Sequence, residues 1–309
     1  MEMHQLRYFA AVARTGNFSQ AARECRVAQP SLSQQIIKLE EEVGERLFER
    51  TQRKALLTPA GSLLLPHAVS ILEAARQVHQ EIREMGGQVR GKILLGALPT
   101  IAPYFLPDII CSFRKKYPAV ELMLHEDTTQ QLLRALEENE LDLALISDAP
   151  PSPRIEIQQL FSEELFLCLP PFHPLVRCNK VVAADLRHEK FILMQDGHCL
   201  GDQTQQFCHS RGFQPEISCR SVQISTVLAM IQAGLGISLI PKMALPRSAK
   251  EGIAYRSLDG LKPRRALALA LSRERKPSLC LLEFTKFVRD ERLRVDAIPS
   301  SLPKARIRR

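Results

Sequence analysis

The chain has 309 residues and a formal net charge of +8 at pH 7, a length that allows more than one domain. No apolar run approaches the ~18 residues of a membrane-spanning helix, and the N-terminus lacks the apolar core of a signal peptide, so we expect a cytoplasmic protein. The positive charge does not mark a nucleic-acid surface by itself, because residues 1–90 contain 12 Lys and Arg against 10 Asp and Glu.

In residues 1–58 the spacing of apolar residues and turn signals predicts three helices. Near the N-terminus apolar residues recur at i, i+3, i+4 and i+7, and Gly16 ends this first helix. Asn17 and Ser19 are both candidate N-caps of a short second helix. Pro30 suits the first turn of a third helix, which ends before a glycine. The expected buried face of the third helix consists of Leu32, Ile36, Leu39 and Val43.

The outer face of this third helix is polar, because a rotation of about 100° per residue turns it away from the buried stripe. Glutamine can bond bidentately to adenine and serine can bond several base edges, whereas lysine suits phosphate. Residues 50–54 lie between two apolar pairs and predict a two-stranded wing with a cationic tip for the minor groove. The alternative is a small helical core in an enzyme. The residues expected to contact double-stranded DNA are Gln29, Pro30, Ser31, Ser33, Gln34, Lys38, Arg50, Arg53 and Lys54.

The segment 59–87 is predicted to be a long linker helix. Thr58 and Pro59 form an N-cap and first-turn pair. Its apolar residues alternate steps of three and four, which is a heptad seam that the same helix of a second copy would bury. Packing within one chain is the alternative, but two copies would also present two recognition helices to paired half-sites. The seam consists of Leu64, Ala68, Ile71, Ala75, Val78, Ile82 and Met85.

Residues 91–295 alternate short apolar runs with helical patterns, which predicts an α/β effector domain of two subdomains. We expect mostly parallel sheets with helices on both faces and ligands beyond the carboxyl ends of the strands, where Thr100 and Thr129 lie. The tail 296–309 is basic, and we expect it to be disordered. The candidate strands are 93–97, 120–125, 141–146, 165–169, 191–194, 236–240 and 266–272.

Eight cysteines are present, and none has metal-site spacing, so neither a metal nor a cofactor is predicted. The pair Cys199 and Cys208 differs from the rest, because a turn at Asp196-Gly197 precedes a helix that begins near Cys199. A helix N-terminus and the neighbouring His198 would favour a thiolate. Such a thiolate can attack peroxide to give a sulfenic acid, which Cys208 could resolve.

The spacing of these two cysteines restricts how they can join. Nine residues of helix separate their sulfurs by about 13 Å along the axis. A disulfide requires Cα atoms within about 7 Å. Oxidation must therefore unwind the helix, which converts a covalent event into a change of shape.

The segments FSQAARECRVAQPSLSQQIIKLEEEVGERLFERT and LTPAG resemble the DNA-binding part of LysR-type transcriptional regulators, and the resemblance spans nearly the whole chain. LPTIAPYFLP, HEDTTQQLL and DGHCLGDQTQQFC are similar to the hydrogen peroxide sensors of that family. This implies a bilobed effector domain like a periplasmic binding protein, with Cys199 as the peroxidatic and Cys208 as the resolving cysteine. The implied peroxide pocket consists of Thr100, Thr129, His198, Asp202, Arg264 and Arg265.

Two departures from the resemblance lie in the cysteine segment. Gly201 stands where a bulkier residue is expected, and residues 203–206 also differ. Glycine weakens a helix by about 1 kcal/mol relative to alanine, so we expect a less stable reduced helix.

The sequence therefore predicts a regulator and not an enzyme, with promoter DNA, hydrogen peroxide or a small effector, and RNA polymerase as partners. We expect a homotetramer built as a dimer of dimers. One alternative is a regulator that answers a small organic anion through Thr100 and Thr129, with the cysteines incidental. Another is a thiol peroxidase with a nucleic-acid module, although no CxxC pair is present and Gly234-x-Gly236 lacks a third glycine for a dinucleotide loop.

Overall fold

The computed structural model describes residues 1–50, 55–84, 88–148, 150, 152–245 and 252–295. The chain divides between Gln88 and Val89 into two compact units. The expected tail 296–309 lies outside the described residues.

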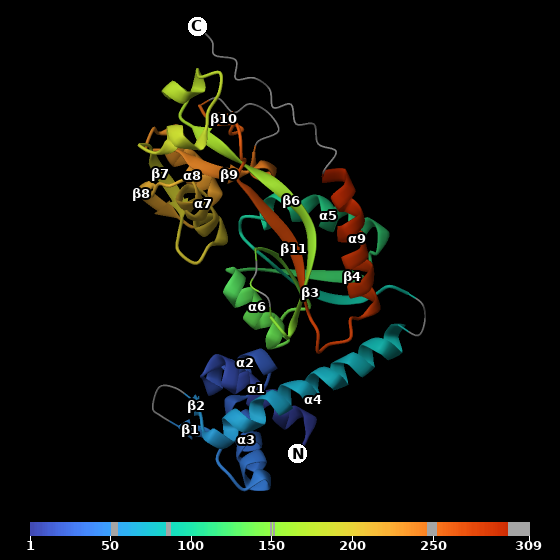
Figure 1. Cartoon of the computed structure of the whole chain (residues 1–309). Coiled ribbons are helices and arrows are strands. Elements are labelled where there is room, and N and C mark those ends of the chain that lie inside the picture. Colours follow the sequence, from blue (N-terminus) through green and yellow to red (C-terminus); the bar gives the residue numbers. More distant parts are fainter. Residues whose placement is uncertain (51–54, 85–87, 149, 151, 246–251, 296–309) are drawn as a thin grey trace. The chain divides into compact units, whose positions relative to one another are not determined.

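The first unit has the predicted order of three helices, a hairpin and a long helix (Figure 1). The hairpin strands are antiparallel, with Phe48 opposite Leu57. Its elements are α1 (Met3–Thr15), α2 (Phe18–Cys25), α3 (Gln29–Val43), β1 (Phe48–Arg50), β2 (Ala55–Leu57) and α4 (Pro59–Glu84).

Local residues set the ends of these helices. The side chain of Asn17, and not that of Ser19, caps α2 by accepting from the Gln20 amide at 3.0 Å. Gly16 ends α1 in the left-handed region, at φ +62°. The Thr58 hydroxyl accepts from the Gly61 amide at 3.0 Å, which confirms the predicted start of α4.

The core of the first unit joins α1 and α3. The predicted residues Leu32, Ile36 and Leu39 are fully buried. Val43 was expected beside them and is 42% exposed, so that part of the prediction is wrong. The reason is that residues 41–43, at the end of α3, are all exposed and lie beyond the core.

The apolar seam of α4 divides into two halves. Leu64 and Ala68 pack against the core of their own unit, as the one-chain alternative requires. Ile71, Val78 and Ile82 are exposed in the single chain, which leaves this half of the seam for a second copy. Met85 lies outside the described residues.

The second unit is built on a seven-stranded sheet with the order β10-β6-β11-β5-β3-β4, and β9 also pairs with β6. A separate parallel pair, β7 and β8, belongs to the second half of this unit. The strands are β3 (Gly91–Ala97), β4 (Val120–Glu126), β5 (Leu143–Ser147), β6 (Ile155–Leu169), β7 (Lys190–Met194), β8 (Glu216–Ser221), β9 (Ser238–Pro241), β10 (Ala254–Arg256) and β11 (Arg264–Ser272).

The expectation of mostly parallel sheets is wrong. Only β3–β4, β3–β5 and β7–β8 pair in parallel among the described strands, while β6 and β11 pair antiparallel with all their neighbours. The reason is that β11 brings the chain back from the second half of the unit and enters between β5 and β6. It therefore runs opposite to both. Strand β6 extends through both halves of the unit (Figure 1), because its first part pairs with β11 and its last residues pair with β9 and β10.

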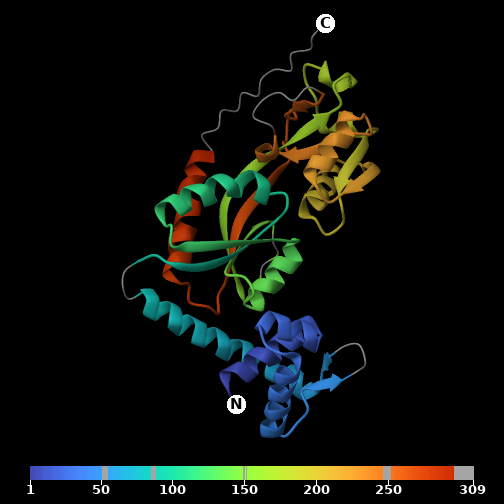
Figure 2. The same ribbon diagram turned by 180° about the vertical axis from the view of Figure 1, so that it is seen from behind.

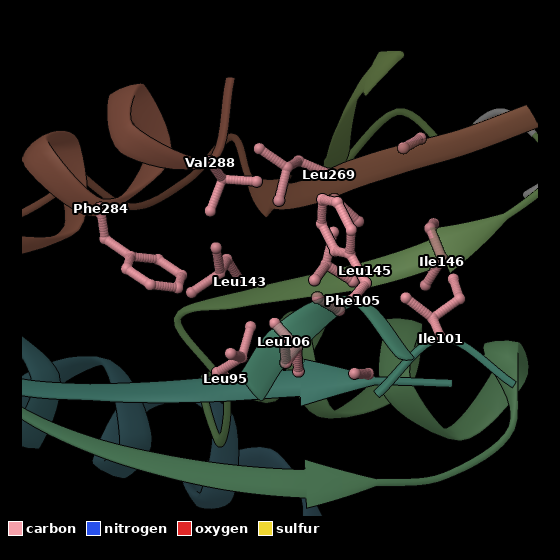
Figure 3. Close-up of a cluster of buried hydrophobic side chains, with 14 of the residues drawn as sticks. Leu95, Ile101, Phe105, Leu106, Leu143, Leu145, Ile146, Leu269, Phe284 and Val288 are labelled. Atoms are coloured by element: carbon pink, nitrogen blue, oxygen red, sulfur yellow. The ribbon is translucent and has the colours of Figure 1, made fainter. Parts of the chain in front are cut away.

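Two buried clusters define two lobes, as predicted for a bilobed domain. The first lobe is built around β3, β5 and β11, and the second lobe around β7, β9 and the end of β6. Figure 3 shows the core of the first lobe, where Leu95, Leu143 and Leu269 of the sheet meet Phe105 and Phe284 of helices. Helices α5 and α9 cover one face of this sheet and α6 the other (Figure 2). The helices are α5 (Ala102–Lys116), α6 (Thr129–Glu137), α7 (Cys199–Ser210), α8 (Ile224–Gln232) and α9 (Leu279–Val295), with short 3₁₀ turns η1 (Pro174–Val176), η2 (Ala183–Leu186) and η3 (Lys242–Ala244).

The strand order of the first lobe reverses at β3, which lies between β4 and β5. The chain passes from β3 through α5 to β4 on one side, then through α6 to β5 on the other. Open sheets bind ligands at such a reversal, beyond the carboxyl ends of the strands. Thr100 and Thr129 both lie there, as predicted. No helix in the described ranges has the length and apolarity to cross a membrane.

Candidate functional site

The outer face of α3 presents the predicted polar residues. Gln29, Pro30, Ser31, Gln34 and Lys38 are exposed, and Ser33 is partly exposed. Gln29 Nε2 donates to Ser33 Oγ at 2.9 Å, so one pair of this face is already ordered without DNA.

The wing beside α3 is described only at its strands. Arg50 belongs to β1, opposite Ala55. Arg53 and Lys54, together with the side chain of Arg50, lie outside the described residues.

Both predicted redox cysteines lie on α7, which begins at Cys199 after a turn in which the His198 amide donates to the Gln195 carbonyl at 3.1 Å. The helix is continuous across both residues, and both thiols are free. Cys208 is buried in the second lobe, whereas Cys199 is half-buried and packs against the core of the first lobe. The two sulfurs therefore belong to different environments.

The charge environment of Cys199 differs from the prediction. Burial raises the pKa of this thiol above its usual value, and this effect outweighs the Arg265 guanidinium, which lowers it. Asp148 raises the pKa further, and the Thr129 hydroxyl lowers it. The expected thiolate is thus disfavoured at neutral pH. The desolvation of the sulfur raises its pKa by more than Arg265 and Thr129 lower it.

A buried ion pair lies beside the sulfur. Arg265 is 1% exposed and donates to Glu163 at 2.8 Å, the residue opposite it in the β11–β6 ladder. It also donates to the hydroxyl and the carbonyl oxygen of Thr100, at 3.0 and 3.1 Å. Glu163 in turn accepts from the Met243 amide at 2.9 Å. Because Arg265 occupies an acceptor position of the Thr100 hydroxyl, the hydroxyl hydrogen of Thr100 can be donated to a ligand.

Two buried polar atoms near Cys199 lack a hydrogen-bond partner within the described chain. They are Thr129 Oγ1 and Gln203 Oε1. The Thr129 hydroxyl is close enough to the sulfur to stabilise its anion, but its geometry is not that of a formed hydrogen bond. Native proteins rarely leave such atoms unpaired without a reason, and a small polar ligand is one.

The structure does not bring all the predicted pocket residues together. Arg264 points away from Arg265, because neighbouring side chains of a strand alternate between faces, and it donates to the Ser162 carbonyl at 2.7 Å. Asp202 lies in the first turn of α7 and is exposed, although its charge raises the pKa of Cys199 slightly. His198 is the half-buried N-cap residue of α7 and forms no side-chain cap.

Three residues that the sequence analysis did not assign also belong to the site. Gln203 Nε2 donates to Ser147 Oγ at 2.9 Å and to the Asp148 carboxylate. Ser147 ends β5, so Ser147 and Asp148 could have been found by inspecting each strand's carboxyl end. Gln203 is a helical residue with no such signal.

The structure explains why a glycine occupies position 201, which the sequence alone did not. A Cβ atom at this position would lie 2.7 Å from the carbonyl oxygen of Met194 on β7. The glycine therefore permits a close approach between α7 and the end of β7, in addition to any effect on helix propensity.

The other six cysteines are free and differ in exposure. Cys168 and Cys280 are buried, Cys25 and Cys219 are partly buried, and Cys111 and Cys178 are exposed. Within the described ranges, no group of His, Cys, Asp and Glu side chains could hold a metal ion.

Comparison with known proteins agrees with this geometry. Residues 3–62 match the family described as "Bacterial regulatory helix-turn-helix protein, lysR family", and residues 86–292 match the "LysR substrate binding domain". The "DNA-binding transcriptional dual regulator OxyR" of Escherichia coli is 37% identical over 270 residues, which cover 87% of this chain and 88% of that protein.

Two solved structures of OxyR proteins are also similar. Full-length OxyR of Pseudomonas aeruginosa, carrying a cysteine-to-aspartate change, has a TM-score of 0.74 and 28% identity, with 94% of both chains covered. A hydrogen peroxide-bound mutant of Corynebacterium glutamicum OxyR has a TM-score of 0.65 and 28% identity, with 100% of this chain and 98% of that chain covered. With a helix-turn-helix unit followed by a bilobed effector domain, this chain belongs to the LysR family of bacterial transcriptional regulators and resembles OxyR.

Proposed function

We propose that this chain is a promoter-binding regulator that senses hydrogen peroxide by reversible formation of a Cys199–Cys208 disulfide. The observation that carries the proposal is the position of the Cys199 sulfur, next to a buried, unpaired Thr129 hydroxyl and an Arg265–Thr100 pair. The relatives' names, hydrogen peroxide-inducible genes activator and OxyR, support the same effector.

The first step oxidises Cys199. Its thiol loses a proton, the sulfur attacks one oxygen of hydrogen peroxide, and the O–O bond breaks to leave a sulfenic acid and one water. Arg265 offsets the negative charge of the attacking thiolate. The hydroxyl groups of Thr100 and Thr129 can donate to the peroxide oxygens, which stabilises charge on the leaving oxygen.

The second step joins the two cysteines. The Cys208 sulfur attacks the sulfenic sulfur, an S–S bond forms, and a second water leaves. Burial raises the pKa of Cys208 to about 12, so its thiol is unreactive inside the folded second lobe. Because α7 also holds the sulfurs about 13 Å apart along its axis, it must unwind before this step.

For DNA, we propose that α3 enters the major groove. Gln29, Ser31, Ser33 and Gln34 would contact base edges, and Lys38 would contact phosphate. Arg50, Arg53 and Lys54 of the wing would contact the minor groove. We further propose that the protein works in the cytoplasm as a homotetramer, where it can meet RNA polymerase.

Two other functions make different predictions. A regulator of a small organic anion would respond fully to its inducer as a Cys199→Ser protein. A thiol peroxidase would consume peroxide continuously when thioredoxin is present, whereas a sensor consumes about one equivalent per disulfide.

The test is to treat the reduced protein with one equivalent of hydrogen peroxide and map its disulfides by mass spectrometry. We expect a 199–208 link in the parent and in a Cys111→Ser control. A Cys208→Ser protein should stop at the sulfenic acid, and Cys199→Ser should not react at this segment. Absence of the 199–208 link in the parent would refute the proposed function.

A further inference from the structure

Helix α7 is tied to the opposite lobe through one side chain between its two cysteines. Gln203 Nε2 donates to Ser147 Oγ at 2.9 Å and to the Asp148 carboxylate, which both belong to the first lobe. By contrast, the nearby Thr204 hydroxyl bonds within α7, to the Leu200 carbonyl at 2.9 Å. Gln203 therefore connects the segment that must unwind to the sheet that does not.

Asp148 is placed for this contact by the backbone. It follows β5 in the left-handed region, at φ +48°, a conformation that aspartate tolerates better than most residues. Its other carboxylate oxygen accepts from the Ala266 amide of β11 at 3.4 Å. Asp148 is exposed, follows β5 directly, makes a long contact with β11 and presents a charged acceptor to Gln203. A hydrogen bond to a charged group is stronger than one between neutral groups.

We propose that Ser147, Asp148 and Gln203 form a latch between the lobes that stabilises the reduced form and sets how readily the disulfide forms. The inference rests on the proposed function, because it assumes that Cys199 and Cys208 join. Unwinding the helix between the cysteines moves the backbone of Gln203, so the latch must open before the sulfurs can meet. These three are positioning residues, since they act through α7.

The latch gives a defined expectation for the thiol–disulfide equilibrium. Breaking hydrogen bonds that exist only in the reduced form shifts the equilibrium toward the disulfide. One charge-assisted hydrogen bond corresponds to about tenfold in that constant. For a two-electron couple this is a change of about 30 mV in reduction potential, toward more negative values.

The experiment equilibrates the full-length protein with glutathione buffers without oxygen and measures the 199–208 disulfide by thiol labelling. In this exchange reaction two cysteine thiols are oxidised to one disulfide, and one glutathione disulfide is reduced to two glutathione molecules. The variants are Gln203→Met, which removes both bonds, and Asp148→Gly, which removes the carboxylate and tolerates the positive φ. Asp148→Asn keeps an acceptor without the charge, and Glu126→Gln removes an exposed carboxylate at the same sheet edge.

We expect the equilibrium constant for disulfide formation to rise about tenfold in Gln203→Met and about threefold or more in Asp148→Gly. In Asp148→Asn the equilibrium constant should return most of the way from the Asp148→Gly value to the parent value. A general loss of folding would not produce this recovery. Glu126→Gln should have the same constant as the parent. If Gln203→Met or Asp148→Gly stays within about twofold of a parent that forms the link, the latch is refuted while the proposed function stands. If the parent forms no link, both are refuted.

Discussion

At Cys199, burial and the Asp148 carboxylate favour the neutral thiol, while Arg265 and Thr129 favour the thiolate. Burial is the largest of these influences, so the pKa lies above the usual range of a free cysteine. Because only the thiolate attacks peroxide, its small population limits the rate at neutral pH. In the proposed mechanism the neighbouring groups act on the bound peroxide and on the negative charge that develops during attack.

This balance predicts the pH dependence of Cys199 oxidation. In a Cys208→Ser protein, which stops at the sulfenic acid, the rate should rise about tenfold per pH unit from about pH 6 to about pH 8, since each unit below the pKa cuts the thiolate fraction tenfold. The measurement is the rate of sulfenic acid formation at fixed peroxide, with the Cys199→Ser/Cys208→Ser protein as a blank. A plateau beginning below neutral pH would show a lowered pKa and contradict this account.

Among the elements, α7 combines a helical segment with a close contact to a strand. The sequence suggested that Gly201 weakens this helix by about 1 kcal/mol relative to alanine. The structure shows that the same glycine allows α7 to approach the Met194 carbonyl. The two effects of an added methyl group oppose each other, and the steric one involves a backbone atom that cannot rotate away.

Gly201→Ala should therefore destabilise the reduced protein by about 1–3 kcal/mol despite the better helix propensity of alanine, as overpacking usually does. Urea unfolding of the reduced protein measures this. The control is Gln206→Ala, an exposed position on the same helix, which should change the stability by less than about 0.5 kcal/mol. A Gly201→Ala protein as stable as the parent would disprove the steric argument.

The recognition helix α3 makes a separate prediction about DNA. Gln34→Ala should reduce discrimination between the promoter of the chain's own gene and unrelated DNA by about 1–3 kcal/mol, because it removes a base contact. Lys38→Ala should weaken binding to both DNAs equally and lower the salt slope by about 1, because it removes a phosphate contact. Binding titrations at several salt concentrations distinguish the two. Unchanged affinity in both variants would exclude α3 from the interface.

The sequence predicted elements best where local residues decide them. Asn17, Thr58 and the apolar stripe of α3 specify helix ends and faces without help from distant residues. It missed β8, β10 and the first ten residues of β6, where polar residues are frequent and pairing with distant strands decides the structure.

The candidate site shows the same limit. The sequence identified both cysteines and the two threonines. The pairing of Arg265 with Glu163 depends on the β11–β6 register, and the contact of Gln203 with Ser147 depends on how the two lobes meet. Neither can be read from residue spacing. The raised pKa of Cys199 was missed for the same reason, since burial is a property of the folded domain.

For the molecule as a whole, the exposed half of the α4 seam implies association of copies. Ile71, Val78 and Ile82 form an apolar stripe that would otherwise face water. A regulator that reads paired half-sites also requires two recognition helices.

Val78→Glu should therefore weaken the dimer by at least tenfold, which is about 1.4 kcal/mol, because it places a charge in a buried seam. His79→Glu changes an exposed position about 100° around the helix and serves as the control. Sedimentation analysis over a range of concentrations measures both proteins. Equal association of the two variants would show that this stripe does not form the interface.

The central claim is that the two cysteines cannot join while α7 remains a helix. Amide hydrogen exchange of residues 199–208 tests it most directly, with the reduced and the oxidised full-length protein measured side by side. We expect the amides of this segment to be protected in the reduced protein and to lose protection when the disulfide is formed, while those of β5 and β11 stay protected. A disulfide-linked protein that keeps the protection of α7 would contradict the account.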